Sequence, residues 1–295
     1  MSAHILDVPA AAYHRDEVGD GPTLSASTAV TLIQKTPLHA YVEHPRLNPA
    51  FVPEEPKKAW DLGSIVHSLL LEGLDLAHVV EGYDDWRTKA AQAEAQEARD
   101  RKQIPMLRHQ WEEASALVDA ARAELALWPL DPPALTDGKP ERTLVWTNEK
   151  FGVACRCRPD WLHDEQRVIE DVKTSAFGAD PYLFSRKTVY TYGYDLRAAM
   201  YLDAVKTLFD VTATWRWIVL ETKPPFTVSV VTPDEEVLAI GQAKYERALE
   251  VWRDCLESGL WPGYGREVHV AAAPPWETRW LNTPELEEAA WSALT

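Results

Sequence analysis

Two stretches near the middle of the chain alternate between apolar and polar residues with the period of two that is typical of β-strands. The first spans residues 155–160, where cysteine, cysteine and proline alternate with arginine, arginine and aspartate. The second begins at residue 168 and is rich in β-branched side chains. Between them, the polar residues 163–166 predict a turn. We therefore expect a β-hairpin, in which Asp171 and Lys173 lie two residues apart and project from the same face.

Other segments carry the helical period or further strand signals. Ser25 or Ser27 is expected to cap the first helix. Thr232 is expected to cap the last helix, with Pro233 in its first turn. The expected helices cover residues 25–42 with an interruption at Pro37, 57–72, 86–127 with a break near Pro105, 191–209 and 233–258, with a short helix or loop at 182–187. The further strands cover residues 142–148, 212–221 and 226–231.

This order of elements predicts the architecture. Helices come first, then three strands, a helix, two strands and a helix, which indicates an α/β (α+β) fold with one mixed central β-sheet flanked by helices. We expect an irregular lead-in over residues 1–22, a single domain over 23–265 and a C-terminal tail over 266–295. Within the domain, residues 23–130 are expected to be mainly helical and 140–258 to hold the sheet core.

The composition is that of a globular protein, with 295 residues, 46% hydrophobic residues and 13 tryptophans. No apolar run approaches the roughly 20 residues that cross a bilayer, and the N-terminus lacks the pattern of a signal peptide. The three cysteines favour a reducing compartment, so we expect a cytoplasmic protein without membrane partners. They are also too few to ligate an iron–sulfur cluster unaided, so no such cluster is expected.

The net charge of −16 argues at first sight against a nucleic-acid partner, but the charge is unevenly distributed. Residues 86–109 carry six lysines and arginines against three acids, whereas residues 221–295 carry 13 acids against six bases. The acidic part either keeps the protein soluble or lies opposite a basic surface that threads a nucleic acid. Charge alone leaves both interpretations open.

The predicted hairpin brings Asp160 close to Asp171 and Lys173. Two carboxylates with a lysine beside them can hold a divalent metal ion and orient a water molecule against a phosphodiester. Glu170 projects to the opposite face of the strand and is not expected to take part. An ordinary hairpin whose end carries surface charges explains the same residues equally well, because the triplet is a common one.

Two further residues are candidate metal ligands. His67 follows Gly63 by one turn of a predicted helix, and the missing glycine side chain lets a ligand or another backbone come close. A single helical histidine is nevertheless more often a partly buried packing residue than a ligand. Glu141 opens a predicted strand, where it either adds a carboxylate to the same site or is a solvated strand residue, which is the role we favour.

Taken together, these patterns resemble the PD-(D/E)XK nucleases, with Pro159-Asp160 as the first element of the signature and Asp171-Val172-Lys173 as the second. More narrowly, the chain resembles the RecE-type, exodeoxyribonuclease VIII-like, nucleases of phage and prophage recombination. The order and spacing of the matching pieces, over residues 22–265, carry this resemblance. They are Leu24-Ser-Ala-Ser, Pro37, Gly63-Ser-Ile-Val-His67 with the residues up to Glu72, Trp86-Arg-Thr-Lys89, Pro159-Asp160, Asp171-Val-Lys173-Thr-Ser, and Tyr192-Gly-Tyr-Asp195 with Tyr201.

The resemblance implies a metal-dependent hydrolase with a defined set of residues. Lys173 would hydrogen-bond the attacking water and stabilise developing charge, and it forms the expected catalytic set with Asp160 and Asp171. Carboxylate and carbonyl oxygens suit Mg²⁺, and Mn²⁺ is expected to substitute for it. The expected metal ligands are His67, Asp160, Asp171, the backbone carbonyl of Val172 and, as a further candidate, Glu141.

Candidate DNA contacts lie outside this set. Arg197 stands where the related RecB-type nucleases carry a glutamine, and an arginine can contact a phosphate more strongly. The other candidates are basic residues for phosphate groups and tyrosines that pack or stack against a strand. For each of them a solvated or packing role is equally open. They are Arg87, Lys89, Arg186, Lys187, Tyr194 and Tyr201.

Three functions are compatible with these features. The resemblance implies a 5′→3′ exonuclease that resects linear double-stranded DNA ends for single-strand annealing recombination. Such an enzyme is expected to form a trimeric or tetrameric ring and to pass single strands to a RecT-type annealing protein. It would act in the cytoplasm of a bacterial host cell or be encoded by a prophage. The alternatives are a metal-dependent endonuclease of restriction or repair type and a catalytically silent DNA-binding module. A complete set of acids with a lysine argues against the silent module, which needs no such lysine.

Overall fold

The computed structural model describes residues 4–52, 58–278 and 281. The chain divides into two compact units, Met1–Gly263 and Tyr264–Thr295, and each is considered by itself. All the strands and helices described below belong to the first unit. None of the helices in the described part of the chain is both long and apolar enough to cross a membrane.

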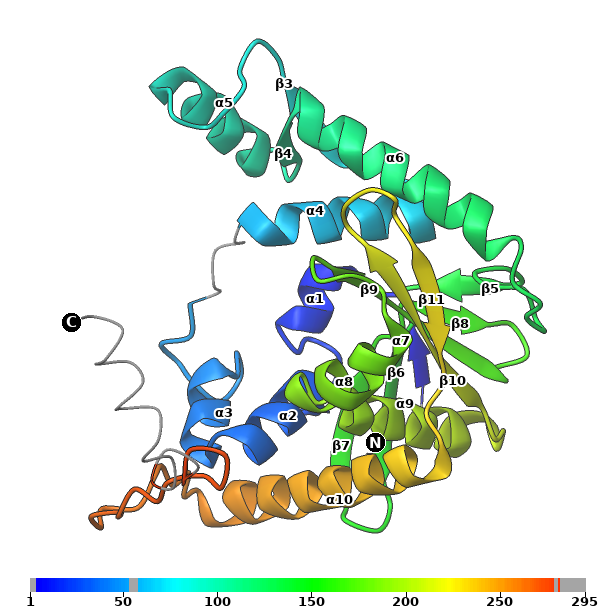
Figure 1. The fold of residues 1–295 in the computed structure, drawn as a ribbon. Helices are drawn as coiled ribbons and strands as arrows, with labels where there is room; N and C mark the ends of the chain where they lie inside the picture. Colours follow the sequence, from blue (N-terminus) through cyan, green and yellow to red (C-terminus); the bar gives the residue numbers. More distant parts are fainter. Residues whose placement is uncertain (1–3, 53–57, 279–280, 282–295) are drawn as a thin grey trace. The chain divides into compact units, whose positions relative to one another are not determined.

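A five-stranded mixed sheet runs through the first unit, in the order β11–β10–β9–β8–β5 (Figure 1). β9 (Val168–Ser175) and β10 (Thr214–Glu221) are parallel and pair along their whole length. The other neighbours are antiparallel, namely β11 (Val228–Val231), β8 (Trp161–His163) and β5 (Gly138–Pro140). This sheet is the mixed sheet that the sequence predicts.

The other strands lie in two separate sheets, so the prediction of a single sheet is wrong. A four-stranded sheet has the order β1–β6–β7–β2, and β3 and β4 form a parallel pair. The bounds are His4–Leu6 for β1, Leu24–Ser25 for β2, Ala77–Val80 for β3, Ile104–Leu107 for β4, Thr143–Asn148 for β6 and Val153–Cys157 for β7.

The strand predicted over residues 155–160 is also shorter than expected. It ends at Cys157, and the chain leaves the four-stranded sheet there to enter the five-stranded sheet at Trp161. Pro159 lies in this crossing, and proline has no N–H group to donate to a strand ladder. The hairpin is therefore formed by β8 and β9, with Trp161 opposite Glu170.

The helices largely follow the predicted segments. Ser25 caps α2 by accepting a hydrogen bond from the Thr28 N–H. Asp234, rather than Thr232, caps α10, because the Thr232 hydroxyl donates to the Trp215 carbonyl instead. Residue 57, the predicted start of the helix before His67, lies outside the described residues. The helices are α1 Ala10–His14, α2 Ala26–Gln34, α3 Pro37–Glu43, α4 Lys58–His67 with the π-turn η1 Ser68–Glu72, α5 Lys89–Asp100, α6 Arg108–Leu125, α7 Pro181–Leu183, η2 Phe184–Thr188, α8 Val189–Thr191, α9 Tyr194–Phe209 and α10 Glu235–Ser258.

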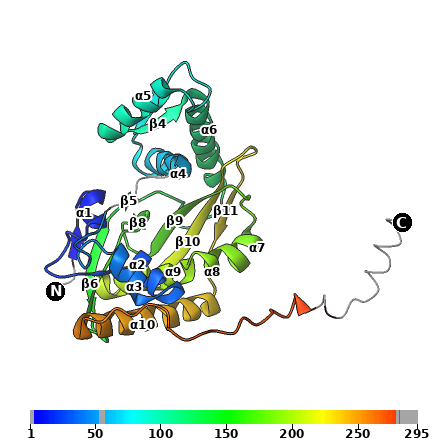
Figure 2. The ribbon, with the colours of Figure 1, turned by 90° about the vertical axis from the view of Figure 1, so that its left-hand side faces the viewer.

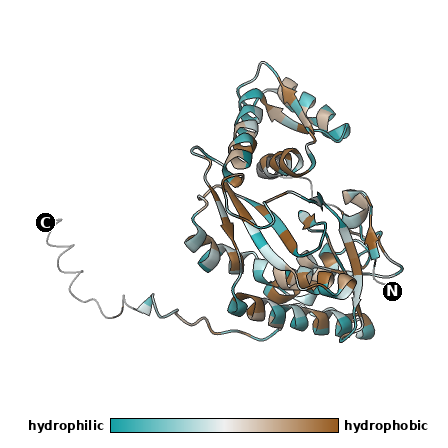
Figure 3. Cartoon of the chain, turned by 90° about the vertical axis from the view of Figure 1, so that its right-hand side faces the viewer, coloured by the Kyte–Doolittle hydropathy of each residue, from teal (hydrophilic) through white to brown (hydrophobic). Residues whose placement is uncertain are grey.

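Alternation along β10 divides the interior into two cores. Trp215 and Trp217 pack in the core that includes buried residues of α2, α9 and α10. Ile218 and Leu220 pack in the core that includes residues of α4, η1 and α6. Figure 2 shows α4 and α6 above the five-stranded sheet and α9 and α10 below it. In Figure 3 the strands are largely brown, while the helices alternate between brown and teal, as helices with one buried face do.

Within the lead-in predicted over residues 1–22, the described residues 4–22 are not irregular. They contain β1, which pairs with β6, and α1, which carries the buried Tyr13. Asp16 is fully buried and its Oδ1 accepts a hydrogen bond from Nη1 of Arg156 at 2.7 Å. A buried arginine on β7 requires such a partner, because an unpaired buried charge is costly. The N-terminal segment is thus held against the four-stranded sheet.

Candidate active site

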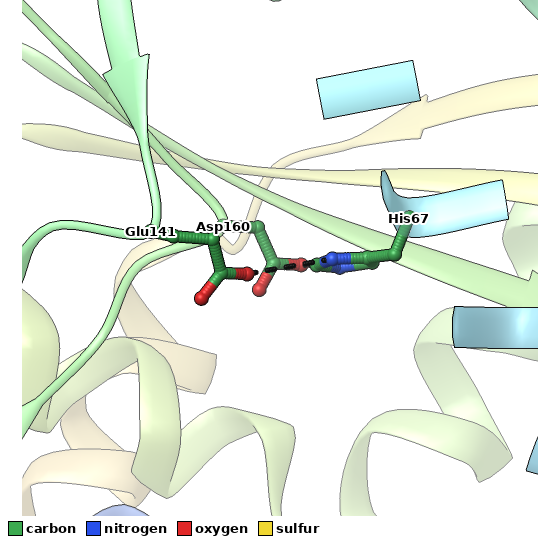
Figure 4. Close-up of side chains that lie close together, drawn as sticks. All are labelled: His67, Glu141 and Asp160. Carbon is green, nitrogen blue, oxygen red and sulfur yellow. Dashed lines mark ion pairs between the residues drawn. The ribbon is translucent and has the colours of Figure 1, made fainter. Parts of the chain in front are cut away.

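His67 lies at the end of α4, and its two ring nitrogens face two carboxylates that come from different loops (Figure 4). Its Nε2 is 2.9 Å from Oδ2 of Asp160, and its Nδ1 is 3.4 Å from Oε1 of Glu141. Asp160 follows β7 and precedes β8, and Glu141 lies between β5 and β6. Helix α4 and the two loops that connect the four-stranded and five-stranded sheets therefore meet at the imidazole ring.

Lys173 connects this cluster to β9. Its Nζ is 2.6 Å from Oδ2 of Asp171 and 3.8 Å from Oδ2 of Asp160. The Val172 N–H donates to Oδ2 of Asp160 at 2.7 Å, and the Val172 carbonyl accepts a hydrogen bond from Nζ of Lys173 at 3.2 Å. The strand alternation that places Asp171 and Lys173 on one face thus lets the lysine lie between two carboxylates.

Glu141 is held by an arginine that sequence reasoning missed. Nε of Arg158 donates to Oε2 of Glu141 at 2.5 Å, while its Nη1 donates to the Val8 carbonyl and to the Thr143 hydroxyl. The Glu141 side chain is only 22% exposed, so the solvated role favoured from the sequence is wrong. In the sequence, the only sign that Arg158 belongs to the site is its position directly before the Pro159-Asp160 motif.

Burial and the neighbouring charges shift the pKa values of the cluster. Burial alone would lower the pKa of His67, but the carboxylates of Asp160 and Glu141 outweigh it and raise the value to about 10. Burial alone would raise the pKa of Asp160, but Lys173 and His67 lower it to about 2. Burial raises the pKa of Asp171 to about 6, opposed by Lys173 and aided by Asp160. The two aspartates therefore differ in how readily they ionise.

The donor set fits a divalent cation. His67, Glu141 and Asp160 each offer one ligand atom, and these atoms lie within 4.8 Å of one another. A cation placed among them would find two carboxylate oxygens and one imidazole nitrogen, a mixture that suits Mg²⁺ or Mn²⁺. Asp171 is not in this trio, because its carboxylate is paired with Lys173. The Val172 carbonyl accepts a hydrogen bond from the same lysine, so the roles of Asp171 and this carbonyl as metal ligands stay predictions.

A cleft of about 910 Å³ opens beside the cluster. His67, Glu141 and Arg158 line one part of it, and His14 of α1 and Gly63 of α4 line others. An extended substrate placed in this cleft would have direct access to the His67 and Glu141 side chains.

The predicted DNA contacts divide into three groups. Tyr194 and Arg197 lie at the start of α9, and the Tyr194 ring is 5.2 Å from Nζ of Lys173. Tyr201 is a core residue, 7% exposed and packed edge-on against Trp215, so the prediction that it contacts DNA is wrong. The last group is basic and exposed: Arg186 and Lys187 on η2, and Arg87 and Lys89 near the start of α5. In Figures 1 and 2, α5 lies across α4 from the five-stranded sheet.

The fold and this cluster together define a protein of the PD-(D/E)XK type. The model of the PDDEXK-like domain of unknown function, DUF3799, matches residues 28–273. The chain therefore belongs to this family, and the resemblance to the PD-(D/E)XK nucleases is confirmed.

One solved structure supports the same fold, and a second is reported beside it. A candidate exonuclease from Eubacterium rectale is 13% identical, with a TM-score of 0.58 over 93% of this chain and 98% of that chain. A phage-related exonuclease from Haemophilus somnus is 12% identical, with a TM-score of 0.32 over 81% of this chain and 96% of that chain. No curated protein matches the chain. At these identities the first likeness establishes the fold alone.

Proposed function

We propose that the chain is a Mg²⁺-dependent deoxyribonuclease that degrades linear double-stranded DNA from its ends. The observation that carries the proposal is the position of Lys173, between Asp171 and Asp160, beside the trio of His67, Glu141 and Asp160. A surface cluster that only contributed solubility would not need buried carboxylates around a lysine. The name of the Eubacterium rectale neighbour supports an exonuclease rather than another hydrolase.

Each residue has a role that follows from its contacts. His67, Glu141 and Asp160 would hold the cation, with Asp171 next to them. The bound cation would polarise a phosphoryl oxygen and lower the pKa of a water molecule. Lys173 would donate a hydrogen bond to the attacking water or to the phosphate and stabilise the charge that develops there. Arg158 fixes the orientation of Glu141, and the Val172 N–H fixes that of Asp160.

The proposal extends to the biological setting by resemblance to the RecE-type nucleases. It includes 5′→3′ polarity, resection for single-strand annealing recombination, and delivery of the product to a RecT-type annealing protein. It also includes Mn²⁺ as a substitute for Mg²⁺, a homo-oligomeric ring and a cytoplasmic location. The endonuclease alternative uses the same cluster but does not need a DNA end, so it would also cleave a closed circle.

The test is digestion of linear duplex DNA that carries a label at either the 5′ or the 3′ end, beside closed circular duplex of the same sequence. We expect release of the 5′ label first, with Mg²⁺ and not with a chelator, and no cleavage of the circle. Asp160→Asn should abolish the reaction. Asp164→Asn, an exposed aspartate in the turn of the same hairpin, is the matched control and should retain it.

Each contrary outcome has a distinct meaning. Cleavage of the closed circle would favour the endonuclease, and early release of the 3′ label would contradict the polarity. Absence of cleavage under every divalent cation would refute the nuclease and leave the silent binding module.

A further inference from the structure

The segment that connects β9 to α9 is rich in aromatic side chains. Of the 20 residues 175–194, six are phenylalanine or tyrosine, whereas aromatic residues make up 10% of the whole chain. The same segment carries two bases and one acid, in a chain whose net charge is −16. Aromatic rings combined with local positive charge are typical of surfaces that bind single-stranded nucleic acid.

Four aromatic rings form a ladder from the core to the surface. Trp217 of β10 is buried and contacts Phe184 edge-on, with 5.8 Å between the ring centroids. Phe184 stacks with Tyr194 at 6.1 Å and 29°. Tyr194 in turn stacks with Tyr192 at 5.7 Å and 27°, and Tyr192 is 56% exposed. The ladder therefore ends on an exposed ring at the surface.

This ladder passes the catalytic lysine. Nζ of Lys173 lies 5.2 Å from the centroid of the Tyr194 ring, and it is paired with Asp171 on the same strand. Tyr192 is thus one stacking step away from the ring that contacts Lys173. A nucleotide chain whose phosphodiester lies at Lys173 would have a neighbouring base within reach of the exposed ring.

The turn that carries Tyr192 is fixed rather than free. Gly193 has φ +65°, and a Cβ atom there would lie 2.7 Å from Cγ2 of Val30. Nε2 of Gln34 donates to the carbonyls of Tyr190 and Thr191, at 3.3 and 3.2 Å. Helix α2 therefore holds the turn on both sides of Tyr192, and the glycine allows two tyrosines two residues apart to stack on each other.

We propose that Tyr192 is a stacking platform for a base of single-stranded DNA next to the phosphodiester in the site. A single strand is favoured over a duplex, because the bases of a duplex already stack on one another and their faces are covered. Arg186 and Lys187, exposed on η2, would contact the phosphates of the same strand. The inference rests on the proposed function, since it takes Lys173 as the place of cleavage.

The test compares two oligonucleotides of equal length, oligothymidylate and an abasic backbone, by fluorescence anisotropy. All proteins carry Asp160→Asn so that the probes survive. The parent should bind oligothymidylate more tightly than the abasic strand. Tyr192→Ala should weaken oligothymidylate binding about 5- to 150-fold, the size of one base–aromatic stack, and leave abasic binding unchanged. Tyr192→Phe should retain the parent affinity, and Tyr192→Leu should not.

The outcomes separate this inference from the proposed function. Equal binding of the two probes by the parent, or an equal loss on both probes in Tyr192→Ala, would overturn the stacking platform. A loss in Tyr192→Phe as large as in Tyr192→Ala would also overturn it, because that result assigns the contact to the hydroxyl. Thermal unfolding of each variant identifies losses of binding that are due to misfolding. If Tyr192→Ala is misfolded, the affinity of Tyr192→Phe for the two probes decides whether the ring binds the base. Cleavage by the wild-type chain is measured separately, so its failure is distinguishable from a failure of stacking.

Discussion

At the scale of single residues, alternation along β9 gives two adjacent carboxylates different surroundings. Asp171 faces Lys173 and the candidate metal site. Glu170 is fully buried on the opposite face, where its Oε1 pairs with Nη1 of Arg216 at 3.1 Å and its Oε2 accepts from the Leu135 N–H at 2.7 Å. One carboxylate lies beside the candidate site, and its neighbour lies in a buried ion pair.

Alanine substitution should therefore affect activity at Asp171 and stability at Glu170. Asp171→Ala is expected to abolish hydrolysis with little change in the free energy of unfolding, because burial already disfavours ionisation of this carboxyl. Glu170→Ala is expected to lower the unfolding free energy by about 3–5 kcal/mol, because it leaves the Arg216 charge buried without its partner. Urea denaturation and a digestion assay measure both. Near-native cleavage by Asp171→Ala would show that the site is assigned to the wrong residue.

Lys173 belongs to the same scale. Lys173→Ala should reduce turnover about 10²- to 10³-fold, the usual effect of losing one electrostatic stabiliser, yet retain metal binding. The carboxylates that hold the cation stay in place, and one competing positive charge is removed. Calorimetric titration with Mg²⁺ or Mn²⁺ checks the second half of this expectation. If metal binding disappeared together with turnover, Lys173 would be a structural neighbour of the site.

At the scale of elements, the close contact between α9 and α10 positions the start of α9 relative to the site. Gly241 of α10 lies against the backbone of Asp195, and a Cβ atom at residue 241 would be 2.2 Å from the Asp195 carbonyl oxygen. Asp195 follows Tyr194 directly, so any displacement of this turn also moves the ring beside Lys173.

For Gly241→Ala, the sign of the change in unfolding free energy tests this contact. Helix propensity alone predicts a gain of about 1 kcal/mol in unfolding free energy from glycine to alanine. The backbone contact predicts a loss instead, on the order of 1–3 kcal/mol, because neither helix can yield without repacking. Chemical denaturation decides between them. Ala243→Gly, at an exposed position of α10, is the control and should cost about the propensity difference.

At the scale of the whole molecule, the proposed nuclease and its proposed DNA substrate are both acidic. The net charge of −16 repels DNA, and salt weakens whatever phosphate contacts form. A ring closed around the duplex solves this topologically, and closed symmetric assemblies are the usual form of oligomers. Tryptophans of the C-terminal part are candidates for subunit contacts in such a ring, because aromatic residues are enriched at interfaces. Trp261 packs on Trp252 and Tyr41, Trp276 is 68% exposed, and Trp280 and Trp291 lie outside the described residues.

We expect light scattering to find a trimer or tetramer. Digestion started together with an excess of competing DNA should still yield long resected tracts, because a closed ring does not dissociate between steps. A monomer that releases DNA after a few nucleotides would contradict the ring and leave the nuclease proposal standing.

The sequence by itself determined the features that depend on local periodicity. Alternation along 168–173 placed Asp171 and Lys173 on one face and Glu170 on the other, and the helical period placed His67 on α4. Such patterns are readable because each residue's direction is fixed by its near neighbours in the chain. The order of strands and helices also indicated the fold class correctly.

The tertiary structure alone decided which of these pieces meet. Alternation does not say to which sheet a strand belongs. The sequence therefore did not predict that the chain passes from one sheet to another at Arg158–Asp160. The Arg158 contact to Glu141 and the Asp16 contact to Arg156 join residues 17 and 140 positions apart. Buried charges need partners, but any acid in the chain can satisfy that need. Only the packed chain selects which one does.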